Sequence, residues 1–419
     1  MGLTLTEKIL AKAAGTDRVE PGEIINARVD AVIGHDISTA AFRELVKMKV
    51  TKVFDRNKVF FTVDHFAPSP SLDAAAQLKD LYAFIDQYEI KNWFELGRGG
   101  ICHAIFPEQG LITPSTVVLG ADSHTCTYGA LGTFATGMGV TDIASAMALG
   151  EVWLKVPASM KIEFDGVVGD MITGKDLILH VIGNIGVDGA LYQAMEFCGS
   201  AIRGLPIDDR FTICNMAIEA GAKNGIIAVD HVTTDYLLNR AKESYQSLAS
   251  DDTAQYDRNF RWDASAITPL VAQPDSPANV APAADLQKIR VNQVVIGSCT
   301  NGRITDMRAA ARILKGQKVA RGVRLLIFPA TQEIYLQAMR EGLIETFVEA
   351  GAVISPPICG PCLGAHMGLL AAGEVAISTT NRNFVGRMGH RDSRVYLSSP
   401  FTAAASAVAG YIVSPREVC

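Results

Sequence analysis

The chain has 419 residues, 48% of them hydrophobic and 20% charged, which is enough for two or three compact domains and leaves no room for long disorder. Its net charge of −6 argues against a surface for nucleic acid or anionic membranes. Eight cysteines are too few for a disulfide-rich secreted protein of this length, and no secretion signal or long apolar span is visible. We therefore expect a cytoplasmic protein with no membrane or nucleic-acid partner.

The N-terminal part reads as a helix followed by short strands. Thr4 and Glu7 have the spacing of a capping box, which predicts a helix that stops near Gly15. The first residues also fit a short myristoylation pattern, but the helix explains the same residues and is the interpretation we prefer. Strand-like apolar runs then occupy residues 24–29, 31–34, 59–63 and 116–120.

Histidines and aspartates gather where these runs end. The glycine-rich stretch 96–103 predicts a loop that carries one more histidine. An Asp beside a His can fix its tautomer and raise its pKa, which suits proton transfer near neutral pH. A single Asp–His pair is most simply explained by a histidine buried in the core. Several such pairs at strand ends instead favour a catalytic cleft. The candidates are His35, Asp64, His65, His103, Asp122, Ser123 and His124.

The middle of the chain changes character near residue 157. We expect a strand at 161–168, a helix at 175–185 and an amphipathic helix at 236–245. Asn215 and Glu219 are four residues apart, so they share a helical face that is either solvated or turned toward a pocket. Prolines and small residues at 268–284 predict an interdomain linker.

Three cysteines in the last part suggest a metal centre. A β-branched run at 290–296 ends just before Cys299, and apolar residues at helical spacing follow. A second strand at 352–354 leads into a proline- and glycine-rich loop with Cys359 and Cys362. If three thiolates bind a metal ion or an iron–sulfur cluster, one coordination position is left open for another ligand. Spacing alone also permits a zinc site, or cysteines that are merely buried or redox-active.

Polar residues beside the cysteine loop suggest anion binding. After a strand at 375–379 come Asn381, Arg382 and Arg387. Arginine captures carboxylates through two parallel hydrogen bonds, so these side chains are candidates for substrate binding. The last elements that we expect are a strand at 395–397 and an alanine-rich helix that ends near Gly410.

Taken together, these segments resemble the aconitase superfamily, and within it the large subunits of the isopropylmalate- and homoaconitate-type hydro-lyases. The resemblance extends over nearly the whole chain. It is carried by residues 63–66, 120–125, 215–222, 297–301, 359–362 and 381–387. It implies an α/β fold in which three α/β/α domains with mixed or parallel sheets surround an interdomain iron–sulfur cleft. We place these domains at 1–157, 158–272 and 286–419, with a linker at 273–285.

The resemblance also implies a mechanism, which is dehydration and rehydration of a 2-hydroxy acid. A [4Fe-4S] cluster on Cys299, Cys359 and Cys362 would leave one iron without a protein ligand, to act as a Lewis acid on the substrate. His103 would protonate the departing hydroxyl. The supporting catalytic residues would be Asp64, His65, Asp122, His124 and Glu219. The substrate-binding residues would be His35, Ser123, Asn215, Asn381, Arg382 and Arg387.

The superfamily takes its base, a serine, from a fourth, swivelling domain. The resemblance implies that a separate small subunit supplies it here, and that this chain alone is inactive. The expected substrates are hydroxy di- or tricarboxylic acids, with the isopropylmalates of leucine biosynthesis first and homoaconitate, dimethylmalate or methylmalate (citraconate) behind them. An RNA-binding protein and a zinc-stabilised structural subunit are the competing classes, and the net charge of −6 counts against the first.

Overall fold

A computed structural model describes residues 2–286, 289–364 and 366–418. Thr4 caps helix α1 (Leu5–Ala14) through the expected capping box with Glu7, and the helix ends at Gly15. None of the described helices is both long and apolar enough to cross a membrane. Larger sheets of five, four and seven strands organise the rest of the chain, and they succeed one another along the sequence.

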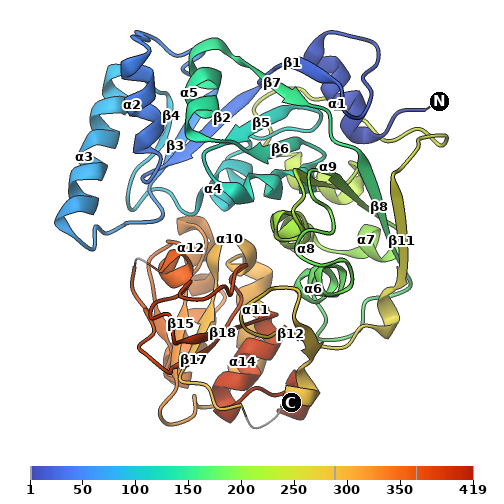
Figure 1. Cartoon of the computed structure of the whole chain (residues 1–419). Coiled ribbons are helices and arrows are strands. Elements are labelled where there is room, and N and C mark those ends of the chain that lie inside the picture. The colour runs from blue at the N-terminus through green and yellow to red at the C-terminus, as the bar shows by residue number, and fades with distance from the viewer. Residues whose placement is uncertain (1, 287–288, 365, 419) are drawn as a thin grey trace.

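The first large sheet is entirely parallel and occupies the blue-to-teal part of Figure 1. Its strands, in spatial order, are β4 (Asn92–Phe94), β3 (Val59–Thr62), β2 (Ala31–His35), β5 (Val117–Gly120) and β6 (Phe134–Gly137). The helices around it are α2 (Thr39–Lys47), α3 (Leu72–Gln87), α4 (Cys102–Glu108) and α5 (Val140–Leu149). Strands β2, β3 and β5 are buried throughout, as expected when helices cover a parallel sheet.

A small ribbon and a second sheet follow. Strands β1 (Ile24–Arg28) and β7 (Glu151–Lys155) pair antiparallel and alternate between exposed and buried residues. The four-stranded sheet is parallel, in the order β10 (Asn224–Ile226), β9 (Ala194–Cys198), β8 (Ser159–Asp165) and β11 (Arg258–Asp263). Its helices are α6 (Gly174–Ile185), α7 (Ser200–Gly204), α8 (Ile207–Asn215) and α9 (His231–Leu237).

The seven-stranded sheet runs from the dark yellow to the red part of Figure 1. Its order is β13 (Val280–Pro282), β12 (Leu270–Ala272), β18 (Arg394–Ser398), β17 (Val375–Ser378), β14 (Gln293–Ile296), β15 (Arg324–Ile327) and β16 (Val353–Ile354). From β18 to β16 the strands are parallel, whereas β12 is antiparallel to both of its neighbours. The helices are α10 (Ser298–Asn301), α11 (Ile304–Leu314), α12 (Gln332–Arg340), α13 (Leu343–Ala350) and α14 (Pro400–Ala409).

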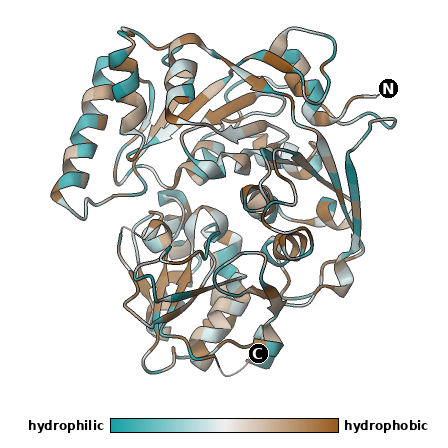
Figure 2. Cartoon of the chain, in the orientation of Figure 1, coloured by the Kyte–Doolittle hydropathy of each residue, from teal (hydrophilic) through white to brown (hydrophobic). Residues whose placement is uncertain are grey.

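Hydropathy follows this layering. In Figure 2 the strands of the first and third sheets are mainly brown, whereas the outlying helix α3 is largely teal. The α/β class predicted from the sequence is confirmed. The division at residues 157, 272 and 285 stays a prediction, although the five- and four-stranded sheets each take all their strands from one of the proposed ranges.

Two expected elements are wrong. The proline-rich stretch contains β12 and β13, so it is part of the third sheet rather than a free linker. Proline is tolerated there because Pro282 lies at the end of an edge strand, where no ladder donor is needed. The helix expected at 236–245 is also absent, because α9 begins earlier, at His231, and ends at Leu237. Beyond it the backbone turns to pair with another loop, and Lys242 N–H donates to the Gly110 carbonyl.

The topology brings the chemically interesting segments together. Strands β3, β2 and β5 are neighbours and parallel, so their carboxyl ends meet at one edge, beside His35, Asp64 and Asp122. In the third sheet, β14 and β17 end next to one another, and the cysteine loops follow from this edge. Helices α4, α8 and α10 lie between the sheets in Figure 1 and contact one another through α10.

Candidate active site

A cavity of about 250 Å³ lies between the first and third sheets. From the first sheet it receives His65, His103, Asp122, Ser123 and His124. From the third it receives Cys299, Cys359, Cys362, Asn381, Arg382 and Arg387. Most of the residues singled out from the sequence therefore line one cavity, although they are up to 322 positions apart along the chain (387 minus 65).

The three cysteines are buried free thiols. The side-chain amides of Asn215 and Asn381 donate to the Cys299 sulfur at 3.3 and 3.2 Å, and the Cys362 thiol approaches Oδ1 of Asn381 at 3.5 Å. Burial, together with the neighbouring Cys362 and Asp122, raises the pKa of the Cys299 thiol to about 12. The free thiol is thus protonated at neutral pH, and binding a metal there must displace its proton.

The chain presents Cys299 on a tight turn. Gly297 has φ 143°, and a Cβ at this position would lie 2.4 Å from the Phe328 carbonyl oxygen, so only glycine fits. Ser298 follows with φ 72°, a left-handed conformation that is rare for residues other than glycine. Cys359 is fixed differently, because its N–H donates to the Asp64 carbonyl at 2.8 Å and ties the cysteine loop to the first sheet.

These residues fit an iron–sulfur centre. Three thiols open into one cavity, and amide N–H groups already point at the Cys299 sulfur, which is how proteins stabilise thiolate-bound clusters. A fourth thiol, Cys102, also lines the cavity, and the sequence did not single it out. Its backbone N–H donates to Oδ2 of Asp64 at 2.7 Å, and burial raises its pKa well above the usual value.

Three imidazole–carboxylate pairs form the opposite wall. Nδ1 of His65 lies 2.6 Å from Oδ1 of Asp64. Nε2 of His103 lies 3.0 Å from Oδ1 of Asp122. Nε2 of His124 lies 2.8 Å from Oε1 of Glu219, which belongs to the second sheet's part of the chain. Pairing of this kind fixes the orientation of each ring.

The side chains in these pairs have pKa values that are shifted in different directions. Burial alone would raise the pKa of Asp64 and lower that of His65, but their mutual attraction prevails, so Asp64 falls to about 2 and His65 rises well above its usual value. Burial also opposes ionisation of Asp122, yet contacts with three imidazoles hold its pKa well below the usual range. For His103 the expected increase is wrong, because burial outweighs Asp122 and lowers the pKa.

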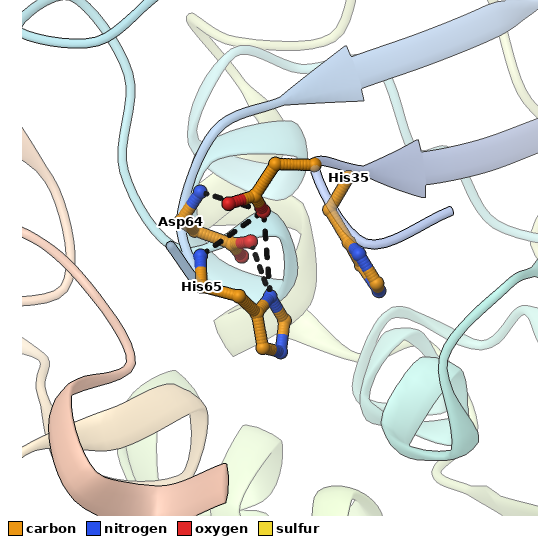
Figure 3. Close-up of side chains that lie close together, drawn as sticks. His35, Asp64 and His65 are labelled. Carbon is orange, nitrogen blue, oxygen red and sulfur yellow. Dashed lines mark hydrogen bonds and ion pairs between the residues drawn. The ribbon is translucent and has the colours of Figure 1, made fainter. Parts of the chain in front are cut away.

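His65 and His103 also differ in the use of their ring nitrogens. Both nitrogens of His103 have partners, Asp122 on one side and the Tyr128 hydroxyl at 3.2 Å on the other. His103 is the second residue of α4 and does not lie in a loop as expected, because the helix starts directly after Ile101. The ring of His65 hydrogen-bonds Asp64 through Nδ1 and also hydrogen-bonds the Cys359 side chain, and in Figure 3 its other nitrogen points away from the Asp64 carboxylate.

His35 lies behind the wall formed by the histidine pairs and does not line the cavity. Its ring lies 4.4 Å from the His65 ring, centroid to centroid, and its Nε2 lies 3.6 Å from Oδ2 of Asp122 (Figure 3). It is buried and is not among the side chains that line the cavity, so the substrate contact that the resemblance implied for it stays a prediction.

The cluster His35, Asp36, Asp64 and His65 is compact enough to suggest a metal ion of its own. However, the Asp36 oxygens accept backbone N–H groups of Asp64, His65 and Phe66 at 3.3, 3.1 and 2.5 Å. The Asp64 oxygens are occupied by His65 and by the backbone N–H of Cys102. Both carboxylates therefore shape the 64–66 turn, and each of their oxygens already accepts a hydrogen bond.

The two arginines give the cavity its positive charge. Nε of Arg382 donates to Oε1 of Glu219 at 2.8 Å, and the rest of its guanidinium faces the cavity. Nε of Arg387 is buried and has no hydrogen-bond partner among the described residues. A buried N–H group without a partner is costly, so this one fits a site that accepts an anion.

Asn215 and Glu219 lie behind the cavity wall as well. Asn215 is the last residue of α8, whereas Glu219 lies in the 3₁₀ helix Met216–Ala220. The two residues therefore do not share one face of a continuous α-helix, as their spacing had predicted. Asn215 contacts Cys299, Thr300 and Asn381. It thus contacts the cysteine centre, and the substrate-binding role that the resemblance implied for it stays a prediction.

Sequence reasoning missed three buried polar residues. Arg303 donates to the carbonyls of Cys299, Thr300 and His103, so it joins α10 to α4. Tyr128 is fully buried and contacts His103. Lys175 is fully buried at the start of α6. The available signals were a lysine in the first turn of a largely apolar helix and an arginine directly after the Cys299 turn.

The sequence profile of the Aconitase family (aconitate hydratase) matches residues 7–410, and the chain belongs to this family. Membership implies an iron–sulfur cluster. Among its relatives are proteins named 3-isopropylmalate dehydratase large subunit from Thermodesulfovibrio yellowstonii and Caldanaerobacter subterraneus subsp. tengcongensis, each 56% identical over 419 residues, and from Heliobacterium modesticaldum, 54% identical over 419 residues. Each match covers 100% of both chains.

Among solved structures, the holo-form of Thermococcus kodakaraensis aconitase X is 12% identical, with a TM-score of 0.49 over 90% of this chain and 89% of that one. The name of the dehydratase relatives implies that those proteins work with a small subunit.

Proposed function

We propose that the chain is the large, cluster-carrying subunit of a hydro-lyase that interconverts 2-isopropylmalate and 3-isopropylmalate by dehydration and rehydration in leucine biosynthesis. The observation that carries the proposal is the meeting of three buried thiols, three imidazole–carboxylate pairs and two arginines in one cavity. Identity of 54–56% over the full length of relatives with that name supports the choice of substrate.

Cys299, Cys359 and Cys362 would hold a [4Fe-4S] cluster, with Asn215 and Asn381 donating to sulfur. When bound, such a cluster would supply a Lewis-acidic iron without a protein ligand, which weakens the bond to the departing hydroxyl. The side chains of the chain then bind and orient the substrate and move the proton.

Arg382 and Arg387 are the groups for the substrate carboxylates. Arg382 is preset by Glu219, and Arg387 has the buried unpartnered Nε described above. Orientation by preset cations lowers the entropy lost when the substrate binds. Ser123 lines the same cavity and offers a hydroxyl donor and acceptor.

For the proton donor we keep His103, as the resemblance implies. Its ring is oriented by Asp122 on Nε2 and by the Tyr128 hydroxyl on Nδ1. His65 is not better placed, because its ring hydrogen-bonds both Asp64 and the side chain of Cys359, a proposed cluster ligand.

The base that removes the C–H proton would come from a small subunit, as a serine on a swivelling domain. This completes the reaction and places part of the specificity for the isopropyl group outside the chain. We expect the assembled enzyme to work in the cytoplasm, where thiols stay reduced.

The test is assembly and assay of the two-subunit enzyme under anaerobic conditions. Iron and sulfide content should correspond to one [4Fe-4S] cluster per large subunit, and turnover with 2-isopropylmalate should exceed turnover with homoaconitate and with citraconate. Stoichiometric zinc without sulfide would contradict the cluster. A preference for one of the other two acids would move the proposal to that substrate.

A further inference from the structure

Lys175 is the least expected charge near the site. It is the second residue of α6 and is fully buried. A buried ammonium group without partners would cost several kcal/mol, on the order of the desolvation penalty of an ion in a protein. Its presence therefore requires compensating contacts.

Those contacts come from the third sheet's part of the chain. Nζ lies 2.7 Å from the Thr379 carbonyl oxygen, 2.7 Å from the Thr380 carbonyl oxygen and 3.4 Å from Oδ1 of Asn301. An ammonium group offers three N–H donors, which matches these three acceptors, whereas a neutral amine offers two. No carboxylate among the described residues forms an ion pair with Nζ. The charge of Lys175 is therefore not neutralised by one direct partner and acts on all the charged groups around it.

Both ends of this contact lead to the cysteine centre. Thr379 and Thr380 immediately precede Asn381, whose amide donates to the Cys299 sulfur. Asn301 lies on the short helix α10 together with Cys299. The side chain of Lys175, on helix α6, therefore holds two segments that carry or adjoin the thiols.

We propose that Lys175 is a positioning residue for the reaction: its ammonium group fixes the backbone that carries Asn381 and Arg382, and it places a positive charge behind the cysteine centre. This inference rests on the proposed function, because it assigns a role toward the cluster site. It concerns a residue that touches neither substrate nor sulfur.

The charges around Lys175 support this role. Burial lowers its pKa to about 7, and the neighbouring Asp306, Cys299, Cys362 and Asp176 act in the opposite direction. A centre built on three thiolates carries negative charge, and a nearby cation offsets it at short range in the protein interior. Removing that cation should make reduction of the centre harder, because reduction adds a further negative charge.

The experiment compares Lys175→Met, Lys175→Gln and Lys175→Arg in the reconstituted two-subunit enzyme. Met keeps the length without donors or charge, Gln keeps two N–H donors without charge, and Arg keeps the charge. The readouts are the reduction potential of the cluster, followed by electron paramagnetic resonance, and the KM and kcat for 2-isopropylmalate. Lys223→Met is the matched control, since Lys223 belongs to the same part of the chain, and burial likewise lowers its pKa.

We expect both neutral variants to shift the potential to more negative values, Arg to restore it, and Met alone to raise KM about tenfold because the Asn381–Arg382 backbone loses its anchor. Lys223→Met should match wild type. An unchanged potential and KM in Lys175→Met would overturn the proposal, as would an equal shift in the control. Failure of both neutral variants to fold would assign Lys175 to stability alone and overturn it too. Failure of the proposed function would instead appear in the wild-type enzyme, as missing iron and sulfide.

Discussion

Glu219 and Arg382 meet at 2.8 Å, and the same Glu219 oxygen also lies 2.8 Å from Nε2 of His124. These three residues come from the parts of the chain that form the second, third and first large sheets. A single carboxylate therefore links a substrate-binding arginine to an imidazole on the opposite wall.

Replacing this carboxylate should misplace the arginine. We expect Glu219→Gln to lower kcat/KM by about 10- to 100-fold, or ~1.4–2.7 kcal/mol, because a buried charged hydrogen bond is replaced by a weaker neutral one. Steady-state kinetics with 2-isopropylmalate measures the effect. Glu333→Gln is the control, since Glu333 pairs with Arg340 at an exposed surface where such pairs contribute little. Equal losses in the two variants would contradict the role of Glu219.

The four thiols of the cavity should separate into two groups. Cys299→Ser, Cys359→Ser and Cys362→Ser should each abolish assembly of the [4Fe-4S] cluster, because the three thiolates are its proposed ligands. Cys102→Ser should retain iron, sulfide and the visible absorption of the cluster. Loss of the cluster in Cys102→Ser, with retention in any of the others, would show that the ligand set is wrong.

The proton donor can be identified by paired substitutions. His103→Ala should abolish turnover and leave the absorption of the cluster intact, because it removes the proposed proton donor and no cluster ligand, whereas His65→Ala should retain measurable turnover. Turnover and absorption spectra of the two variants decide between them. If His65→Ala is inactive while His103→Ala turns over at a near-normal rate, the donor is His65 instead.

The contact between α6 and α8 should make stability depend on pH. Asp209 accepts a hydrogen bond from Gly174 N–H, and burial, reinforced by Asp306, Asp208 and Asp176, raises its pKa to about 8 from 3.8. The folded state thus holds this proton up to higher pH than the unfolded state. The resulting stability is complete below about pH 4 and is lost as pH rises through about 8.

Asp209→Asn should therefore lose less stability between pH 5 and pH 8 than wild type does. Thermal unfolding followed by circular dichroism at these two pH values measures the difference. Asp80→Asn is the control, since the Asp80 side chain is 59% exposed. A parallel decline in Asp209→Asn and wild type would show that Asp209 does not cause the pH dependence.

The sequence predicted the strands well, because parallel strands buried on both faces are continuous apolar runs such as Val59–Thr62 and Gln293–Ile296. It also predicted the cysteines and their cavity neighbours, since these residues follow strand ends. It failed where tertiary contacts override local pattern. Residues after Leu237 turn because the backbone near Arg240 packs against Gly110, where a Cβ would lie 1.7 Å from the Arg240 carbonyl oxygen.

Roles were harder to predict than positions. The second partner of the His103 ring is Tyr128, which is 25 residues away from His103 and carries no motif. Likewise, the balance between burial and Asp122 that lowers the pKa of His103 is a property of the packed interior. Lys175 escaped notice because a lysine in a helix is usually a solvated residue.

The cavity joins residues from position 37 to position 387, and this has a consequence for how the protein is made. A ribosome releases the histidines long before the thiols, and domains generally fold as they emerge, N-terminal first. The first sheet can thus be complete while Cys359 and Cys362 are still being translated. Iron and sulfide therefore meet the complete set of three thiols only after Cys362 has emerged from the ribosome.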